Sequence, residues 1–167
     1  MRIPVFLSCP TVLGAKQKRA RQQVVQLLRQ LHLEPRALGR SDYPSEYPLR
    51  EVYVIAKHCS GGIILGFEQL WVKTGIWKQA TREVKVQRNF AMPTPWNQLE
   101  AGILFGLNLP LLIFKERGIK GGVFDEGVTD VFVHTMPDGK TSPAQREALK
   151  EVFLKWHARV QEHYRRY

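Results

Sequence analysis

Cysteine and clustered histidine are scarce in this chain. Its 167 residues include two cysteines, Cys9 and Cys59, and five histidines. The sequence contains no CxxC or HxxxH spacing, which would be typical of a zinc site. Two isolated cysteines also fail to make a disulfide framework. We therefore expect a reduced, cytoplasmic protein that holds no metal.

Long apolar runs are lacking as well. The longest candidate, residues 101–114, is interrupted by Asn108 and Pro110, which makes it a poor membrane span. The first residues lead directly into an apolar strand, without the charged start, apolar run and cleavage site of a signal peptide. We expect no membrane segment. A chain of this length is about one domain long, so residues 1–167 are predicted to form a single domain.

Acidic residues are missing from the first part of the chain. No Asp or Glu precedes Glu34, and the formal net charge is +10. A second basic run, residues 73–88, holds five Lys and Arg residues against Glu83 alone. Such a distribution favours anionic partners, namely nucleotides, nucleic acid or an acidic protein surface. A solvated surface is the simpler interpretation of either run alone.

Short apolar runs alternate with helical patterns along the chain. The runs are continuous, which is typical of parallel strands that are covered on both faces. The helical patterns repeat apolar residues at three- and four-residue spacing. Strands are predicted at 3–9, 33–38, 63–65, 109–114 and 131–133, and helices after Gly14, at 49–58, at 94–107 and after Ser142.

This order predicts a flavodoxin-like three-layer α/β sandwich, with a five-stranded parallel sheet in the order 2-1-3-4-5. In that topology ligands bind at the carboxyl ends of the strands, beside the point where the order reverses. The loops after Cys9 and Leu65 and the helix start at Thr94 should converge there. Residues 68–93 show no clean periodicity, and we expect a long loop of the functional or mobile kind.

Glu100 is the main candidate for a functional residue. It lies in the second turn of the predicted 94–107 helix, which is otherwise almost wholly apolar. An ionised carboxylate on a largely buried helix is costly unless it is paired or used. Trp96 precedes it by four residues and so shares its face of the helix. A purely structural carboxylate, bonded to an arginine or to the backbone, is the alternative interpretation.

Residues 94–100 read Thr-Pro-Trp-Asn-Gln-Leu-Glu and resemble a motif of Toll/interleukin-1 receptor (TIR) domains. The Trp-to-Glu spacing matches the motif, and Asn97 stands where the family has cysteine. The same helix is similar to that of nucleoside deoxyribosyltransferases, whose catalytic glutamate lies in a Glu-x-Gly context, here Glu100-Ala101-Gly102. The segment Val5-Phe6-Leu7-Ser8-Cys9 resembles the first strand of both groups. The resemblance covers roughly residues 3–135, although segment 68–93 is longer than the TIR connection there.

The resemblance implies an enzyme that breaks the bond between a ribose-type sugar and a base. Glu100 would stabilise an oxocarbenium-like state. A cationic nicotinamide leaves without protonation, so a single carboxylate favours NAD⁺ as the substrate, with no resident cofactor. Asp42 and Asp125 are candidates for a second carboxylate. A role as an antiviral or stress-signalling effector follows from the same resemblance.

Two other functions stay open at this point. One is a nucleotide or nucleoside N-glycosidase or deoxyribosyltransferase. The other is a non-catalytic module whose basic surface binds nucleic acid or protein.

Supporting site residues are proposed around Glu100. Ser8 and Cys9 would form the floor of the pocket, where their backbone amides could meet phosphate. Phe67 and Trp96 would sandwich a base, and Asn97 would bond ribose hydroxyls. The free N–H groups at the helix start could receive a pyrophosphate. Core packing is the alternative for both aromatic residues, and Cys9 alternatively serves as a small buried apolar side chain.

The loop Gly39–Pro48 occupies the place where TIR domains dock a neighbouring subunit. By resemblance it would mediate homo-oligomer assembly, which in many TIR enzymes completes the active site. An activator would then be a partner chain or an assembly event. An ordinary connection is the alternative.

Overall fold

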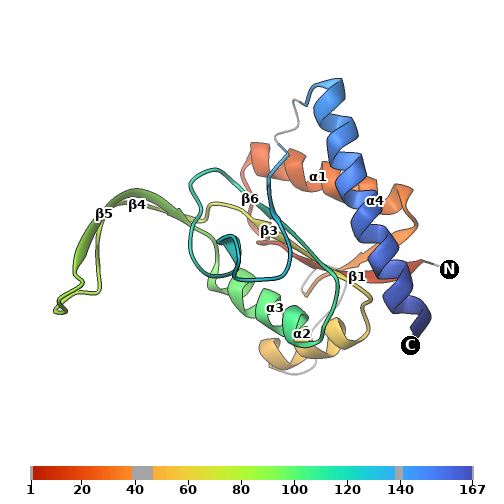
Figure 1. Ribbon diagram of the computed structural model, residues 1–167, viewed down its shortest axis with the longest axis horizontal. Helices are drawn as coiled ribbons and strands as arrows, with labels where there is room; N and C mark the ends of the chain where they lie inside the picture. The colour runs from red at the N-terminus through yellow and green to blue at the C-terminus, as the bar shows by residue number, and fades with distance from the viewer. Residues whose placement is uncertain (1, 39–46, 138–140, 167) are drawn as a thin grey trace.

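A five-stranded parallel sheet forms the centre of the protein, as predicted (Figure 1). The computed structural model describes residues 2–38, 47–137 and 141–166. The sheet order β2-β1-β3-β6-β7 is the expected flavodoxin-like order, since β6 and β7 are its fourth and fifth strands along the chain. The strands are β1 (Ile3–Ser8), β2 (Leu33–Arg36), β3 (Gly62–Gly66), β6 (Leu111–Lys115) and β7 (Val133–Thr135).

Helices cover both faces of this sheet and make it the middle of three layers. Side chains of α1 (Ala15–Gln30) and α4 (Pro143–Arg166) pack on one face. Those of α2 (Pro48–Lys57) and α3 (Pro95–Gly106) pack on the other. The short helix η1 (Gly122–Phe124) contributes to the second face. Among the described residues, no helix is both long enough and apolar enough to cross a membrane.

Helix starts follow the capping signals in the sequence. The Thr94 hydroxyl accepts a hydrogen bond from the Asn97 N–H at 3.3 Å, which caps α3 at the predicted residue. Ser142 and Gln145 exchange side-chain and backbone bonds at the start of α4, as a capping box does. The start of α3 matters most here, because it fixes where Glu100 falls on the helix.

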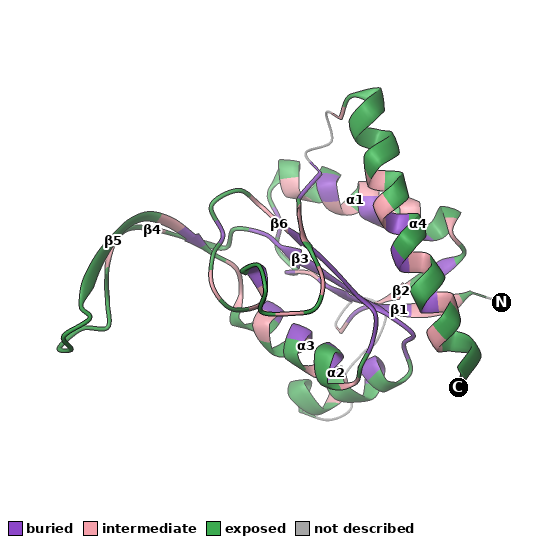
Figure 2. Cartoon of the chain, in the orientation of Figure 1, coloured by how far each residue is buried: buried purple, intermediate pink, exposed green. Residues whose placement is uncertain are grey.

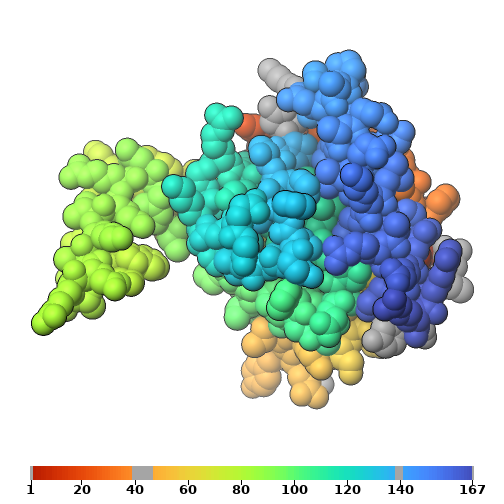
Figure 3. Space-filling model, viewed as in Figure 1, coloured from red at the N-terminus to blue at the C-terminus, as the bar shows by residue number. Residues whose placement is uncertain are grey.

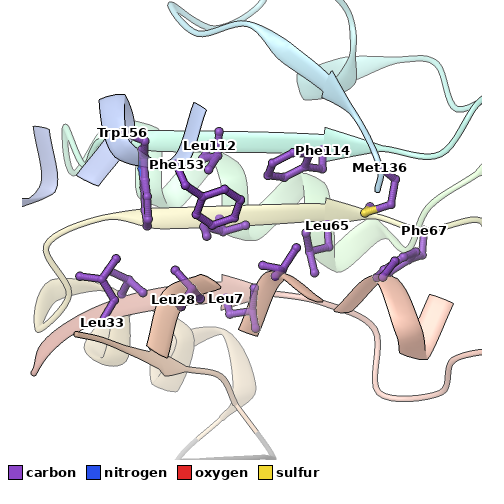
Figure 4. Close-up of a cluster of buried hydrophobic side chains, with 14 of the residues drawn as sticks. Leu7, Leu28, Leu33, Leu65, Phe67, Leu112, Phe114, Met136, Phe153 and Trp156 are labelled. Carbon is purple, nitrogen blue, oxygen red and sulfur yellow. The ribbon is translucent and has the colours of Figure 1, made fainter. Parts of the chain in front are cut away.

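Aromatic side chains fill the core beneath α4 (Figure 4). Phe153 stacks on Phe114 of β6, with ring centroids 5.8 Å apart, and meets Trp156 edge-on at 6.2 Å. The Trp156 indole N–H donates to the Pro110 carbonyl oxygen at 2.9 Å, so its one polar group is satisfied inside the core. The α4 helix is thereby held firmly on the sheet.

Segment 68–93 is not the long loop that was expected. It forms an antiparallel hairpin of β4 (Leu70–Trp77) and β5 (Lys85–Met92), which is a sheet of its own. Figure 1 and the space-filling view in Figure 3 show this hairpin reaching away from the rest of the molecule. Figure 2 shows most of it exposed, in contrast to the buried strands of the main sheet. Pairing between the two strands satisfies the hydrogen-bonding capacity of their backbone N–H and C=O groups, although no core surrounds the hairpin.

Candidate functional site

A cavity of about 320 Å³ opens at the carboxyl end of β1, beside the first two turns of α3. The three predicted segments meet here: the chain after Cys9, the chain after β3, and the start of α3. This is the switch point of the sheet, because the connections from β1 and β3 leave toward opposite faces. The lining residues are Cys9, Pro10, Thr11, Val12, Leu38, Gln69, Thr94, Trp96, Asn97 and Glu100.

Polar side chains lead from Asn97 through Ser8 to the carboxyl group of Glu100. The Asn97 side-chain amide donates to the Ser8 hydroxyl oxygen at 2.8 Å, and Ser8 is hydrogen-bonded to the Glu100 carboxyl group. Because the Ser8 oxygen already accepts from Asn97, its single proton is free to point at the carboxylate. Ser8 and Asn97 are each about 1% exposed, and Ser8 lies behind the described lining residues, so it does not form the pocket floor that was predicted.

Burial raises the pKa of Glu100 from 4.5 to about 7, and the hydrogen bond from Ser8 lowers it in part. Desolvation disfavours the charged form of a carboxyl group, while a donor aimed at that form favours it. Near neutral pH the group is therefore divided between its two protonation states. A perturbed carboxyl group in a cavity is a common property of catalytic sites.

Trp96 and Cys9 line the cavity, as the sequence analysis expected. The Trp96 side chain is 42% exposed and lies one helical turn before Glu100, so its ring is available to a ligand. The Cys9 thiol donates to the Pro10 carbonyl oxygen at 3.5 Å. This weak bond fits a wall residue, and no histidine lines the cavity among the residues that the structure describes.

The structure contradicts the base-stacking role predicted for Phe67. Its side chain is fully buried in the core under α1 and α4, in the cluster that includes Leu65 and Met136, and it does not line the cavity. Its position just after β3 suggested a loop at the cavity mouth. The backbone after β3 instead turns the ring into the core on the face covered by α1 and α4, where burying a phenyl group is favourable. Trp96 is thus the single aromatic residue among the described lining residues.

Asn97 lines the cavity but acts differently from the prediction. Its amide donates to Ser8 and, at 3.4 Å, to the Leu65 carbonyl oxygen, while its oxygen accepts from the Thr94 hydroxyl at 3.2 Å. These bonds occupy a side chain that was expected to bind ribose hydroxyls. Asn97 therefore positions Ser8 and, through it, Glu100. A short polar residue in the first turn of α3, facing a polar residue at the end of β1, was the sequence signal for this link.

Of the two proposed second carboxylates, the structure describes Asp125, which does not line the cavity. Asp42 lies outside the described residues, in the 39–46 part of the predicted docking loop. Asp125 accepts a hydrogen bond from the Gly121 N–H at 2.9 Å and is exposed away from the lining. Within the described ranges, Glu100 is the one carboxyl group of this site. The same residues contain no cluster of three His, Cys, Asp or Glu suited to a metal ion.

A larger cavity, of about 810 Å³, lies between the start of α1 and the ends of β3, β6 and β7. Two carboxyl groups line it, those of Glu68 and Glu116, and the Glu116 carboxyl group accepts bonds from the Gln17 amide at 2.9 Å and the Glu68 N–H at 2.6 Å. These bonds join three segments of the chain. We therefore take the smaller cavity, whose carboxyl group has a perturbed pKa, as the candidate active site.

Comparison with known proteins adds no family to this picture. No protein-family model matches the chain, and a search of curated proteins finds no significant match.

Proposed function

We propose that this chain is an NAD⁺ nucleosidase that hydrolyses the N-glycosidic bond between ribose and nicotinamide. The observation that carries the proposal is the position of Glu100. Its carboxyl group lies in a cavity at the switch point of the sheet, bonded to Ser8 from beneath and one turn from the exposed ring of Trp96. The TIR-like spacing of Trp96 and Glu100 supports the same reading.

The proposed reaction needs only one carboxylate. The bond from ribose C1′ to the nicotinamide nitrogen breaks, and its electron pair neutralises the pyridinium ring, which leaves as nicotinamide. Ionised Glu100 stabilises the positive charge that develops on the ribose. Water then adds to C1′ and loses a proton to the Glu100 carboxylate, giving ADP-ribose. Trp96 stacks on the nicotinamide ring, and the positive end of α3 favours the nearby phosphates.

The test is chromatography of the products after concentrated protein is incubated with NAD⁺. We expect nicotinamide and ADP-ribose to appear in equal amounts. Glu100→Gln should lower the rate by roughly 10²–10³-fold, because the amide cannot stabilise a cation as a carboxylate does. Glu116→Gln, a matched change in the larger cavity, should retain the rate. Equal loss in both variants, or an unchanged rate in Glu100→Gln, would refute the assignment.

Cleavage of a neutral nucleotide or nucleoside is the second candidate function. The observation that favours it is the pKa of Glu100, raised to about 7, which leaves much of the carboxyl group protonated at neutral pH. A protonated Glu100 could donate the proton that a neutral base needs in order to leave. A panel of nucleoside monophosphates decides: release of free base, with NAD⁺ untouched, supports this alternative over the first.

The proposal includes assembly through the Gly39–Pro48 loop, whose residues 39–46 lie outside those that the structure describes. Activation would come from such a homo-oligomer or from a partner chain, in keeping with a cytoplasmic effector role in defence or stress signalling. We expect the rate of NAD⁺ turnover per mole of protein to rise with protein concentration, and sedimentation to show a species larger than the monomer. A rate that is independent of concentration for a monomer would remove assembly from the proposal.

A further inference from the structure

The β4–β5 hairpin has two different faces. Its pairing register is uniform, with Leu70 opposite Met92 at the base and Trp77 opposite Lys85 near the tip. Side chains alternate across a strand, so residues of even number share one face and residues of odd number the other. The even face is mainly apolar, with Leu70, Val72, Ile76, Val86, Phe90 and Met92, and it also carries the Thr74–Arg88 pair.

The odd face combines aromatic rings with cations. Trp71 and Trp77 are 53% and 56% exposed, although tryptophan usually buries most of its surface. Lys73 lies between them on β4, and Lys85 is paired directly with Trp77. Their Cα atoms are about 20 Å apart along the strand, at roughly 3.3 Å per residue. Exposed rings separated by lysine form a surface on which bases can stack while phosphates are neutralised.

Cations lie along the hairpin from Lys73 and Arg88 to the tip, while residues 70–72 and 90–92 at the base carry none. Among the described residues, the one ion pair on the hairpin joins Lys78 to Glu83 at the tip. Four further cations have no acidic partner within the described chain, namely Lys73, Arg82, Lys85 and Arg88. This surface repels a second copy of a chain whose net charge is +10. It attracts a polyanion.

We propose that the β4–β5 hairpin is an arm that binds single-stranded nucleic acid, with bases on Trp71 and Trp77 and phosphates on the surrounding cations. Charge complementarity and the two exposed indoles favour this occupant over another protein. The arm begins at the rim of the candidate active site: Gln69, which lines that cavity, donates its N–H to the Met92 carbonyl oxygen at 3.0 Å. A bound strand would therefore lie beside the cavity. The proposal does not depend on catalysis by Glu100.

Fluorescence anisotropy of a labelled single-stranded oligonucleotide of about 15 nucleotides tests the arm in the full-length protein. We expect binding that weakens as salt rises, with a log–log slope of about −3 if four phosphates are neutralised. Trp71→Leu with Trp77→Leu should weaken binding by about tenfold or more, since an aliphatic side chain cannot stack on a base. The pair Trp71→Phe and Trp77→Phe should restore most of the affinity. Glu100→Gln should leave binding unchanged, which separates this proposal from the proposed enzyme.

Charge reversal provides the matched comparison. Lys73→Glu with Lys85→Glu should weaken binding at least tenfold. Lys18→Glu with Arg19→Glu changes the net charge equally on exposed positions of α1 and should change affinity less than twofold. If both double variants weakened oligonucleotide binding equally, the effect would reflect only the net charge of the protein, and the proposal would be overturned. So would absence of oligonucleotide binding by wild-type protein, or sedimentation as a dimer that Ile76→Thr with Val86→Thr abolishes while the tryptophan pair has no effect on anisotropy.

Discussion

The candidate active site and the β4–β5 hairpin share residue types, but the side chains of the two regions differ in burial and in pairing. At the site, polar groups lie inside the protein and are matched with one another: Asn97 bonds Ser8, and Ser8 bonds Glu100. On the hairpin, apolar and charged groups both face solvent, with Ile76 58% and Trp77 56% exposed. The site is a preorganised arrangement that the fold itself maintains. The exposed groups of the hairpin would be buried or paired only when a partner outside the described chain binds them.

This contrast separates two routes to function within one chain. Preorganised polar groups cost stability when the chain folds and are suited to chemistry on a small molecule. Exposed aromatic and cationic groups cost little in the folded chain and are suited to recognition of a large partner. Substitutions in the two regions should therefore change different measured properties of the protein.

The largest expected difference is in stability. Phe153→Ala removes a fully buried ring that stacks on Phe114, and should lower the free energy of unfolding by about 3–5 kcal/mol. Ile76→Ala removes an exposed side chain on the hairpin and should change it by about 0.5 kcal/mol or less. Urea denaturation of the two variants checks the comparison. A large loss from Ile76→Ala would show that the hairpin is packed against something in solution and end the contrast.

The central sheet and the helix starts could be predicted from the sequence because strands and helix caps have local sequence signals. The run Ile63–Leu65 is continuous and apolar, and Thr94 with Pro95 marks the start of α3. The strand order followed from the alternation of strands and helices. The position of Glu100 and Trp96 at one cavity followed from the topology of parallel sheets.

The hairpin escaped prediction because its period-two pattern is obscured. Trp71 and Trp77 place large apolar groups on the face opposite Val72 and Ile76, so the alternation of apolar and polar residues disappears. The turn also lacks an Asn-Gly or Asp-Gly signal. It uses Lys78 and Ala80 at positive φ, 52° and 63°, which no sequence rule anticipates for these residue types.

The site details missed by the sequence depend on contacts between distant segments. Ser8 and Asn97 are 89 residues apart, and their bond exists only because β1 and α3 meet at the switch point. Phe67 lies next to the cavity in sequence, yet its ring direction is set by packing against α1 and α4. Neither a propensity nor a spacing rule contains this information.

An intermediate effect is expected on the pH dependence of stability. The pKa of Glu100 is about 7 in the folded protein, against an ordinary value of 4.5, so between these pH values the folded state binds a proton that the unfolded state does not. The contribution of this proton to the free energy of unfolding is therefore fully present below pH 4.5 and is lost as the pH rises through 7. Glu100→Gln removes this loss and should stabilise the protein by roughly 1–3 kcal/mol at pH 8 relative to wild type, with little difference at pH 4.5.

Thermal or urea unfolding of both proteins at the two pH values measures this difference. Glutamine keeps an oxygen that accepts the Ser8 bond, so packing is conserved and the titration is isolated. Glu83→Gln, on the exposed hairpin tip, provides the control and should show no comparable dependence. If Glu100→Gln were destabilising at pH 8, the ionised carboxylate would be a structural partner within the fold and the contrast between the two regions would weaken.

The smallest effect concerns the hydrogen bond beneath Glu100. Ser8→Ala removes the donor that lowers the pKa of this carboxyl group, so the pKa should rise further above its ordinary value. Fewer carboxylates are then ionised at pH 7, and NAD⁺ turnover there should fall roughly tenfold. The loss should largely recover at pH 9, where both proteins are ionised, because the variant changes the titration and leaves the carboxylate in place. Ser60→Ala, a buried serine outside the cavity lining, should leave the pH–rate profile unchanged. A uniform loss of rate at every pH would mean that Ser8 fixes the direction of Glu100 more than its charge, while a profile that does not move would exclude the ionised carboxylate as the group that limits the rate.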